Sequence, residues 1–373
     1  MKRIILAPDS FKGGISALEF CKIVKPELEK VFKNAEIISV PIADGGEGTL
    51  ESLCIAANGT LHELSVTGPL GEKVSSKLLF TDSTHAVIEM AQCAGLPLVK
   101  DRENPEKTTT YGVGELISYA VREGAKNITV SLGGSATNDC GTGMLSALGV
   151  RFADVSGNTF VPTGKTLGKI KTISFPDEFE KYKNVRFTAM CDVKNPLLGK
   201  FGCAHIFARQ KGADDSMISR LESAAASFSK VSAEFLGRDF SSEEGAGAAG
   251  GMGFACRAFL NADLKRGIDA VLELCRFDDL AKSADLIITG EGRFDAQSLM
   301  GKVIGGISEH RFNADIAVIC GKYNPFELPE NSGIKYIIPI HEGLELDYAI
   351  AHTREYLIAG VSKLINMLGN TRS

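Results

Sequence analysis

The chain has 373 residues, 44% of them hydrophobic and 23% charged, which is typical of a globular protein of two or three domains. Its formal net charge is −5 and it has no cluster of Lys and Arg, so we expect no nucleic-acid partner. No run approaches the ~18 apolar residues that cross a bilayer or resembles a signal peptide, and the nine Cys include no C-x-x-C pair. We therefore expect a cytoplasmic protein with reduced thiols and no membrane contact.

The N-terminal segment predicts two strand–helix units. Residues 4–7 form a short apolar strand, and Ser16 with Glu19 has the spacing of a capping box at the start of a helix. A second strand is predicted at 37–40 and a second helix at 49–57. Each strand runs into a loop with Gly and Asp, which is where ligands bind in a doubly wound sheet.

The pattern changes near residue 60. Strands are predicted at 61–66, 74–80 and 86–90 with no helix between them, which indicates a mixed or antiparallel sheet. The other elements expected in this part are a helix at 111–122, strands at 128–132 and 185–190, and a helix at 217–236.

Strand–helix alternation returns after residue 280, with strands predicted at 286–288, 316–319 and 336–338 and a last helix at 347–367. Together with the two N-terminal strands these make five. The predicted fold class is therefore α/β, a flavodoxin-like five-stranded parallel sheet domain with a second mixed α/β domain inserted into it. The expected domains are residues 1–65 with 283–373, and the inserted residues 66–282.

The stretch after the first C-terminal strand combines several features of a ligand site. Gly290 and Gly292 are expected to turn the backbone sharply beside a ligand, because they carry no Cβ. Arg293 and Asp295 follow, and the guanidinium is expected to keep the nearby carboxylate ionised. Residues 299–304 are predicted to be helical.

Five loops combine small residues with a carboxylate. Gly-rich turns present backbone N–H groups to anions such as phosphate, and carboxylates beside them can hold Mg²⁺, which shares its oxygen ligands with substrate phosphates. These are the parts of a phosphoryl-transfer site, where positioning and electrostatics do most of the work. The loops are residues 9–14, 44–49, 133–143, 192–195 and 290–298.

Motifs of other enzyme classes are missing or lack their context. Neither the P-loop motif nor the G-x-S-x-G nucleophile elbow occurs. Residues 245–250 match G-x-G-x-x-G, but Ser and Glu residues precede them instead of a strand, which disfavours dinucleotide binding. Close packing of a helix start, or a phosphate contact, is the better interpretation. Residues 210–212 fit a surface turn and a phosphate contact equally well.

Longer blocks around the five loops are APDSFKG at 7–13, ADGGEGT at 43–49, GGSATND at 133–139, CDVKNPL at 191–197 and TGEGRFDAQS at 289–298. In this order, and spread over most of the chain, they resemble the signature blocks of bacterial class I glycerate kinases. Two runs depart from the family pattern. FARQKGA at 207–213 replaces FGPQKGA, and NDCG at 138–141 replaces NDGG, but the polar residues are kept.

The resemblance implies phosphorylation of D-glycerate by ATP with Mg²⁺, to 2-phosphoglycerate. Roles within the blocks are assigned by chemical type. Asp295 is the expected general base with Asp44 as its rival, and Arg293 or Lys12 is expected to pair with the substrate carboxylate. We expect catalytic roles for Asp295, Asp44, Lys12 and Arg293; substrate contacts from Ser10, Asp9, Asn195 and Gln297; ATP contacts from Gly133, Gly134, Ser135, Asn138, Gly247, Gly250 and Lys211; and Mg²⁺ binding by Asp192 and Asp44.

Two other functions stay open at this point. One is a non-catalytic sensor that binds a sugar acid or a nucleotide through the same carboxylates. The other is a Rossmann oxidoreductase, which the context of residues 245–250 disfavours. The sequence also leaves a homodimer open.

Overall fold

The structure is a computed structural model that describes residues 1–11, 13–43 and 48–370. Its contacts divide the chain into two units, which we describe separately. Of the described residues, unit 1 holds residues 1–11, 13–43, 51–58 and 268–370, and unit 2 holds residues 48–50 and 59–267. These limits differ from the boundaries expected at 65/66 and 282/283, which stay a prediction.

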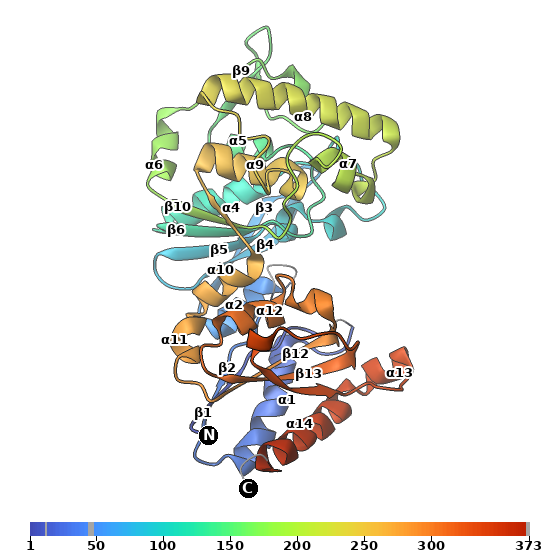
Figure 1. The fold of residues 1–373 in the computed structure, drawn as a ribbon. Helices are drawn as coiled ribbons and strands as arrows, with labels where there is room; N and C mark the ends of the chain where they lie inside the picture. The colour runs from blue at the N-terminus through green and yellow to red at the C-terminus, as the bar shows by residue number, and fades with distance from the viewer. Residues whose placement is uncertain (12, 44–47, 371–373) are drawn as a thin grey trace. The chain divides into compact units, whose positions relative to one another are not determined.

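Unit 1 is built on a five-stranded sheet in which every neighbouring pair of strands is parallel (Figure 1). Its strands are β1 (Arg3–Leu6), β2 (Glu36–Ser39), β12 (Leu286–Phe294), β13 (Asp315–Tyr323) and β14 (Ile334–Pro339). The order across the sheet is β14-β13-β12-β1-β2. Numbered along the chain within this unit, that is 5-4-3-1-2, which is the flavodoxin-like order. The predicted parallel sheet is confirmed.

Two long helices of unit 1 pack on each other over one face of this sheet. They are α1 (Ala17–Val31) and α14 (Thr353–Asn370), and their apolar side chains share a buried cluster with alternate residues of the strands. The predicted capping box at the start of α1 is present, because the Ser16 hydroxyl accepts from Glu19 N and Ser16 N donates to the Glu19 carboxylate. The other helices, which lie mostly or wholly in this unit, are α2 (Thr49–Ala56), α10 (Gly267–Leu274), α11 (Phe277–Ala281), α12 (Val303–His310) and α13 (Leu346–Ala351).

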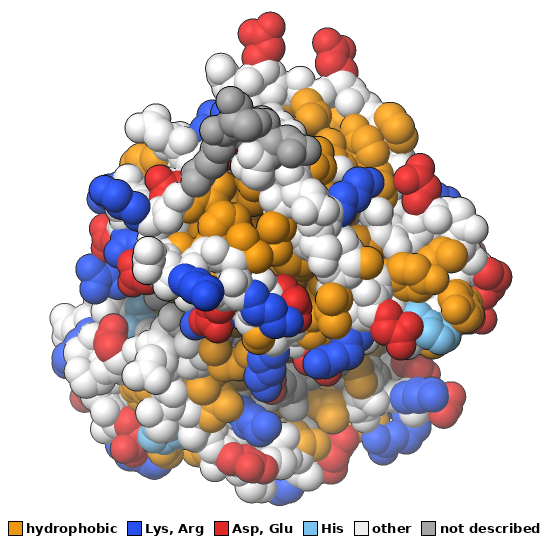
Figure 2. Space-filling view, turned by 90° about the horizontal axis from the view of Figure 1, so that it is seen from below, with side chains coloured by type: hydrophobic (Ala, Val, Ile, Leu, Met, Phe, Trp, Pro, Cys, Tyr) orange, Lys and Arg blue, Asp and Glu red, His pale blue; other side chains and the backbone are white. Residues whose placement is uncertain are grey.

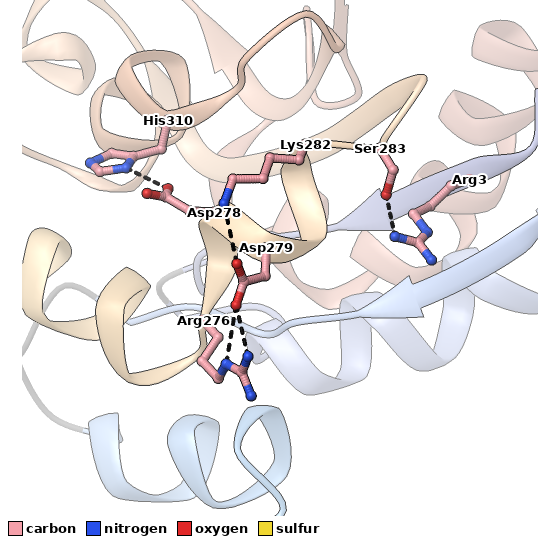
Figure 3. A network of polar contacts seen from close by, with 7 residues as sticks. All are labelled: Arg3, Arg276, Asp278, Asp279, Lys282, Ser283 and His310. Atoms are coloured by element: carbon pink, nitrogen blue, oxygen red, sulfur yellow. Dashed lines mark hydrogen bonds and ion pairs between the residues drawn. The ribbon is translucent and has the colours of Figure 1, made fainter.

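Polar contacts attach the short helix α11 to the elements around it (Figure 3). The Asp279 carboxylate pairs with Arg276 at 2.9 Å and with Lys282 at 3.3 Å. Asp278 Oδ1 lies 2.7 Å from His310 Nδ1 at the end of α12, and the Arg3 guanidinium of β1 donates to Ser283 just beyond α11. The contacts of His310 and Arg3 join this segment to α12 and β1, whereas those of Asp279 lie within α11 and its two ends.

Two helix predictions in unit 1 are wrong. Residues 299–304 are not one helix, because a 3₁₀ turn (Ala296–Leu299) is followed by Gly301 with a φ of +78°, and α12 begins only at Val303. A left-handed residue interrupts a right-handed helix. The single helix expected at 347–367 is two helices, α13 and α14, separated at His352.

Unit 2 contains the predicted mixed sheet, with six strands, of which β11 was not predicted. In sheet order its strands are β11 (Asp263–Lys265), β10 (Arg186–Met190), β6 (Asn127–Ser131), β5 (His85–Glu89), β4 (Lys73–Phe80) and β3 (Thr60–Thr67). The first four are parallel to each other, and β4 and β3 are antiparallel. The carboxyl ends of β5, β6, β10 and β11 therefore share one edge.

Helices on the sheet of unit 2 enclose its core (Figure 1). The rings of Phe228 in α8 contact those of Phe254 and Phe259 in α9, and Figure 1 shows α9 between α8 and the sheet. The helices are α3 (Ala91–Ala94), α4 (Tyr111–Arg122), α5 (Thr142–Ala147), α6 (Glu180–Lys183), α7 (Cys203–Phe207), α8 (Asp215–Leu236) and α9 (Ala248–Leu260). A small sheet of β7 (Arg151–Ala153), β8 (Thr159–Phe160) and β9 (Thr172–Ser174) was not expected.

The distribution of charge on the surface and the hydrophobicity of the helices are as the composition predicts. On the face that Figure 2 shows, positive and negative side chains are interspersed, in keeping with the net charge of −5. Among the described residues, none of the helices is both long enough and apolar enough to span a membrane.

Candidate active site

In unit 1, Asp9 and Ser10 lie in the loop that leaves β1. Asp9 N donates to the carbonyl of Gly290 in the neighbouring strand β12 at 2.8 Å, which fixes the loop at the carboxyl edge of the sheet. The Asp9 carboxylate accepts from Ser10 N at 2.6 Å, and the Ser10 hydroxyl lies 3.4 Å from the same oxygen. The predicted substrate contacts Asp9 and Ser10 therefore lie together at this edge.

The glycines of β12 do not form the sharp turn that the sequence predicts. Both Gly290 and Gly292 lie inside the strand, which continues to Phe294. A Cβ at Gly290 would lie 2.3 Å from the carbonyl oxygen of Ile319 in β13, so close strand packing requires glycine there. The chain turns at Asp295 instead.

Asp295 caps that turn. Its carboxylate accepts from Gln297 N at 2.9 Å, and Asp295 N donates to the Ser298 hydroxyl at 3.1 Å, so the two residues form a capping box. Arg293 is exposed in β12. Within the described part of the chain no ion pair joins Arg293 to Asp295, so the expected influence of the guanidinium on this carboxylate stays a prediction. Gln297 is exposed beside Asp295.

Glu291 is a buried carboxylate at the same edge that the sequence analysis did not single out. It is 8% exposed, and burial raises the pKa of its carboxyl from 4.5 to about 7. The Ser298 hydroxyl and Lys302 favour the charged form and oppose this rise, while the charges of Asp9 and Asp295 add to it. A glutamate inside a β-branched strand, followed by Gly, is the signal that could have revealed it.

Two predicted catalytic residues, Lys12 and Asp44, lie outside the residues that the structure describes.

In unit 2, an exposed turn formed by Gly133 and Gly134 follows β6 at the carboxyl edge of the sheet. The buried Lys211 lies under this turn. Its ammonium donates to the Ser135 hydroxyl at 2.8 Å and to the Thr137 carbonyl at 2.7 Å. Lys211 is 2% exposed, whereas Gln210 and Gly212 beside it are exposed, so the turn at 210–212 lies at the surface with its lysine side chain buried. Burial lowers the pKa of Lys211 to about 8, although the Cys203 thiol and the Asp139 carboxylate act in the opposite direction.

The buried carboxylate of Asp139 accepts four hydrogen bonds that hold the rest of this loop. Its carboxylate accepts from Thr110 N and Thr110 Oγ1 at 2.8 and 2.9 Å, and from Gly141 N and Gly143 N at 3.1 and 3.2 Å. Burial raises its pKa, and these hydrogen bonds act against the rise. Its neighbour Asn138 is fully buried, and its amide nitrogen lies 3.9 Å from Cys203 Sγ. Asn138 therefore lies inside the loop and not on its surface.

Gly247 and Gly250 are buried where α9 meets two loops. A Cβ at Gly247 would lie 2.3 Å from the Pro196 carbonyl oxygen, and one at Gly250 would lie 2.0 Å from the Thr137 carbonyl oxygen. Close backbone packing thus accounts for both glycines, while their role as ATP contacts stays a prediction. The residues described just before them contain no strand, which removes the context of a dinucleotide-binding motif.

Asp192 and Asn195 follow β10, the strand beside β6. Asp192 Oδ1 accepts from Gly267 N at 2.8 Å, and Asn195 Nδ2 donates to the Phe201 carbonyl at 2.8 Å. Asp192 is exposed. Among the described residues, no group of three or more His, Cys, Asp or Glu side chains could hold a metal ion. Asp192 instead fits the mode in which Mg²⁺ takes one or two carboxylates and completes its shell with water and phosphate oxygens.

The predicted residues thus form two groups. Asp9, Ser10, Arg293, Asp295 and Gln297 lie at the carboxyl edge of the unit 1 sheet. The predicted ATP contacts, together with Asp192 and Asn195, lie in unit 2, in its strand-end loops and in the segments packed against them.

Comparison with known proteins finds similarity to glycerate kinases over nearly the whole chain. The model of the glycerate kinase family matches residues 4–369. A glycerate kinase of Bacillus subtilis is 42% identical over 362 residues, covering 95% of this chain and 94% of that protein. The glycerate 2-kinase of Escherichia coli is 42% identical over 308 residues, covering 82% and 81%. The crystal structure of a putative glycerate kinase 2 from Salmonella typhimurium LT2 superposes with a TM-score of 0.90 at 35% identity, covering 100% and 99%. This chain belongs to the glycerate kinase family, and it is an enzyme.

Proposed function

We propose that this enzyme transfers the γ-phosphoryl group of ATP to D-glycerate in a Mg²⁺-dependent reaction that yields 2-phosphoglycerate, as expected for the class I glycerate kinases. The observation that carries the proposal is family membership over residues 4–369. The name glycerate 2-kinase of the Escherichia coli relative supports the choice of the 2-hydroxyl. A cation that grips the substrate carboxylate would also bring the adjacent 2-hydroxyl nearest to the phosphoryl donor.

The reaction balances as an in-line phosphoryl transfer. The 2-hydroxyl oxygen of D-glycerate forms a bond to the γ-phosphorus, the bond from that phosphorus to the β–γ bridging oxygen breaks, and ADP leaves. Asp295 takes the hydroxyl proton in this proposal, and Arg293 or Lys12 holds the substrate carboxylate. Ser10, Asp9, Asn195 and Gln297 contact the substrate.

The ATP phosphates are assigned to unit 2. The exposed Gly133–Gly134 turn leaves backbone N–H groups available to an anion, and the buried ammonium of Lys211 beneath it adds positive charge. Mg²⁺ would be held by Asp192 and Asp44 with phosphate oxygens, and when bound it neutralises charge on the transferred group. Ser135, Asn138, Gly247 and Gly250 complete the proposed ATP site.

Family membership does not favour the alternative of a non-catalytic sensor. A coupled assay of ADP release with D-glycerate tests the distinction, and NMR of the product identifies the phosphorylated hydroxyl. We expect glycerate-dependent ADP release that stops in excess chelator and returns with Mg²⁺. Release that continues undiminished in chelator would remove the metal from the proposal, and a 3-phosphate product would remove the choice of hydroxyl.

A further inference from the structure

Glu291 has an unsatisfied carboxylate oxygen inside the protein. Its Oε1 atom is buried, and the structure gives it no hydrogen-bond partner within the described chain. An unpaired buried oxygen of this kind costs free energy, so it requires a partner such as an ordered water or a bound ligand. The position of Glu291 in the C-terminal part of β12 is where ligands bind in a parallel α/β sheet.

The groups around Glu291 come from four elements. Asp9 from the loop after β1 and Asp295 from the cap of the 3₁₀ turn act on it as like charges, and Lys302 before α12 acts as an opposite charge. Cys320 of β13 is its register partner in the sheet. Together with Glu291 itself, the described residues therefore place three carboxylates and one ammonium in the electrostatic surroundings of this point.

His341 provides a second, independent sign of a polar ligand at this edge. It follows β14, and its Nε2 is also buried without a hydrogen-bond partner among the described residues. His341 N donates to the carbonyl of Gly321, the residue after Cys320, and a Cβ at Gly321 would lie 3.1 Å from His341 Nδ1. Two unsatisfied polar atoms thus belong to the same edge of the sheet.

We propose that Glu291 recognises the 3-hydroxyl of bound D-glycerate by accepting a hydrogen bond at Oε1. This inference rests on the proposed function, and it adds a specificity residue to it. The orientation follows from charge: the carboxylate of the substrate is repelled by Asp9, Glu291 and Asp295, so the end that faces them is the hydroxymethyl end. A site built to bond a substrate hydroxyl rejects analogues that lack it, because its own polar group is then left unpaired.

The test compares three ligands on the full chain by calorimetry. D-lactate is D-glycerate without the 3-hydroxyl, and 3-hydroxypropanoate keeps that hydroxyl but lacks the 2-hydroxyl. We expect the natural protein to bind D-glycerate roughly 10- to 100-fold more tightly than D-lactate, the range of one hydrogen bond to a charged group. A ratio within about threefold of unity would overturn the proposal without any variant.

Two substitutions sharpen the comparison. Glu291→Met keeps the volume but removes the acceptor, so the preference for D-glycerate over D-lactate should fall to within about threefold, and 3-hydroxypropanoate should weaken as D-glycerate does. Glu291→Gln keeps an acceptor oxygen and should keep at least a tenfold preference. Glu355→Met, at an exposed position of α14, is the matched control and should change nothing.

The remaining outcomes are decisive as well. If Glu291→Met weakens the binding of D-glycerate and of D-lactate by the same factor, the residue contacts a group that both ligands share, and the assignment to the 3-hydroxyl is wrong. If the natural protein binds D-lactate and other 2-hydroxy acids well but does not release ADP with D-glycerate, the proposed function fails and this inference fails with it.

Discussion

At the scale of single residues, the buried carboxyl of Glu291 makes the stability of the protein depend on pH. Its folded pKa of about 7 lies above the ordinary value of 4.5, so between these values the folded state binds more protons than the unfolded state. The unfolding free energy must then fall as pH rises from about 4.5 to 7, by up to a few kcal/mol. Glu291→Gln has no such titration.

We therefore expect the melting temperature of Glu291→Gln, relative to the natural protein, to increase as pH rises from 5 to 8. Thermal unfolding followed by circular dichroism at several pH values measures it. Glu345→Gln, at the exposed cap of α13, is the control for loss of one negative charge. A difference that stays constant over this range would show that Glu291 does not titrate there.

Asp295 combines two roles, and the expected effect of its substitution separates them. Asn is also a good N-cap, so Asp295→Asn should keep the turn that Gln297 N and Ser298 close. If Asp295 is the general base, kcat should fall by about 10²–10⁴ with little change in substrate binding.

Ser298→Ala is the matched control, because it breaks the capping box and leaves the carboxylate in place. It should change kcat far less than Asp295→Asn. A kcat of Asp295→Asn within about threefold of the natural value would transfer the base to Asp44, and recovery in excess Mg²⁺ would make Asp295 a metal ligand.

At the scale of the elements, Gly250 tests whether α9 is positioned by backbone packing. It has a φ of +69°, and a Cβ there would meet the Thr137 carbonyl oxygen at 2.0 Å. Gly237 has a similar φ of +73° with nothing within 4 Å. Gly237→Ala should cost about 1 kcal/mol of unfolding free energy for the strained φ alone, whereas Gly250→Ala should cost several kcal/mol more.

Urea unfolding of both variants gives the comparison. Similar losses of unfolding free energy for the two variants would mean that the Thr137 loop moves aside easily. Backbone packing would then not require glycine at position 250, and the proposed ATP contact would be the main reason for it.

The elements that the sequence predicted well are those with long, periodic apolar patterns. The helix Tyr111–Arg122 was predicted with its observed ends, and every strand of the two large sheets except β11 was found, although β12 extends well beyond the predicted 286–288. The small sheet of β7, β8 and β9 has strands of two or three residues, which are too short to show a period. In β12, Gly290 was interpreted as part of a turn. Its actual reason is packing against the carbonyl of Ile319 in the neighbouring strand, which leaves no room for a Cβ and which the sequence does not show.

In the candidate site, too, the sequence predicted the features that local motifs carry but not those that depend on packing. Motifs located the strand-end loops, because Gly, Asp and Ser there are visible in the sequence. They could not show that Lys211 is buried against Ser135 or that Glu291 lacks a partner, since both facts depend on packing between distant segments.

At the scale of the whole molecule, the predicted ATP contacts and the predicted base belong to different units. Unit 2 from residue 59 to residue 267 is one continuous segment, and a large apolar cluster lies entirely within it. Such a segment has the features of an independently folding domain. All predicted ATP contacts lie within it, whereas Arg293 and Asp295 do not.

We therefore expect the isolated segment 59–267 to unfold cooperatively and to bind a non-hydrolysable ATP analogue within about tenfold of the full chain, because the loop with Gly133 and the buried Lys211 are intact. It should release no ADP with D-glycerate, since the proposed base is missing. Circular dichroism, calorimetry and the coupled assay measure the three properties, with Lys211→Met in the same segment as the control that should lose ATP binding. A folded segment that does not bind the analogue would show that the ATP contacts assigned to unit 2 are wrong or insufficient without unit 1, and glycerate-dependent ADP release by the segment would overturn the assignment of the base to Asp295.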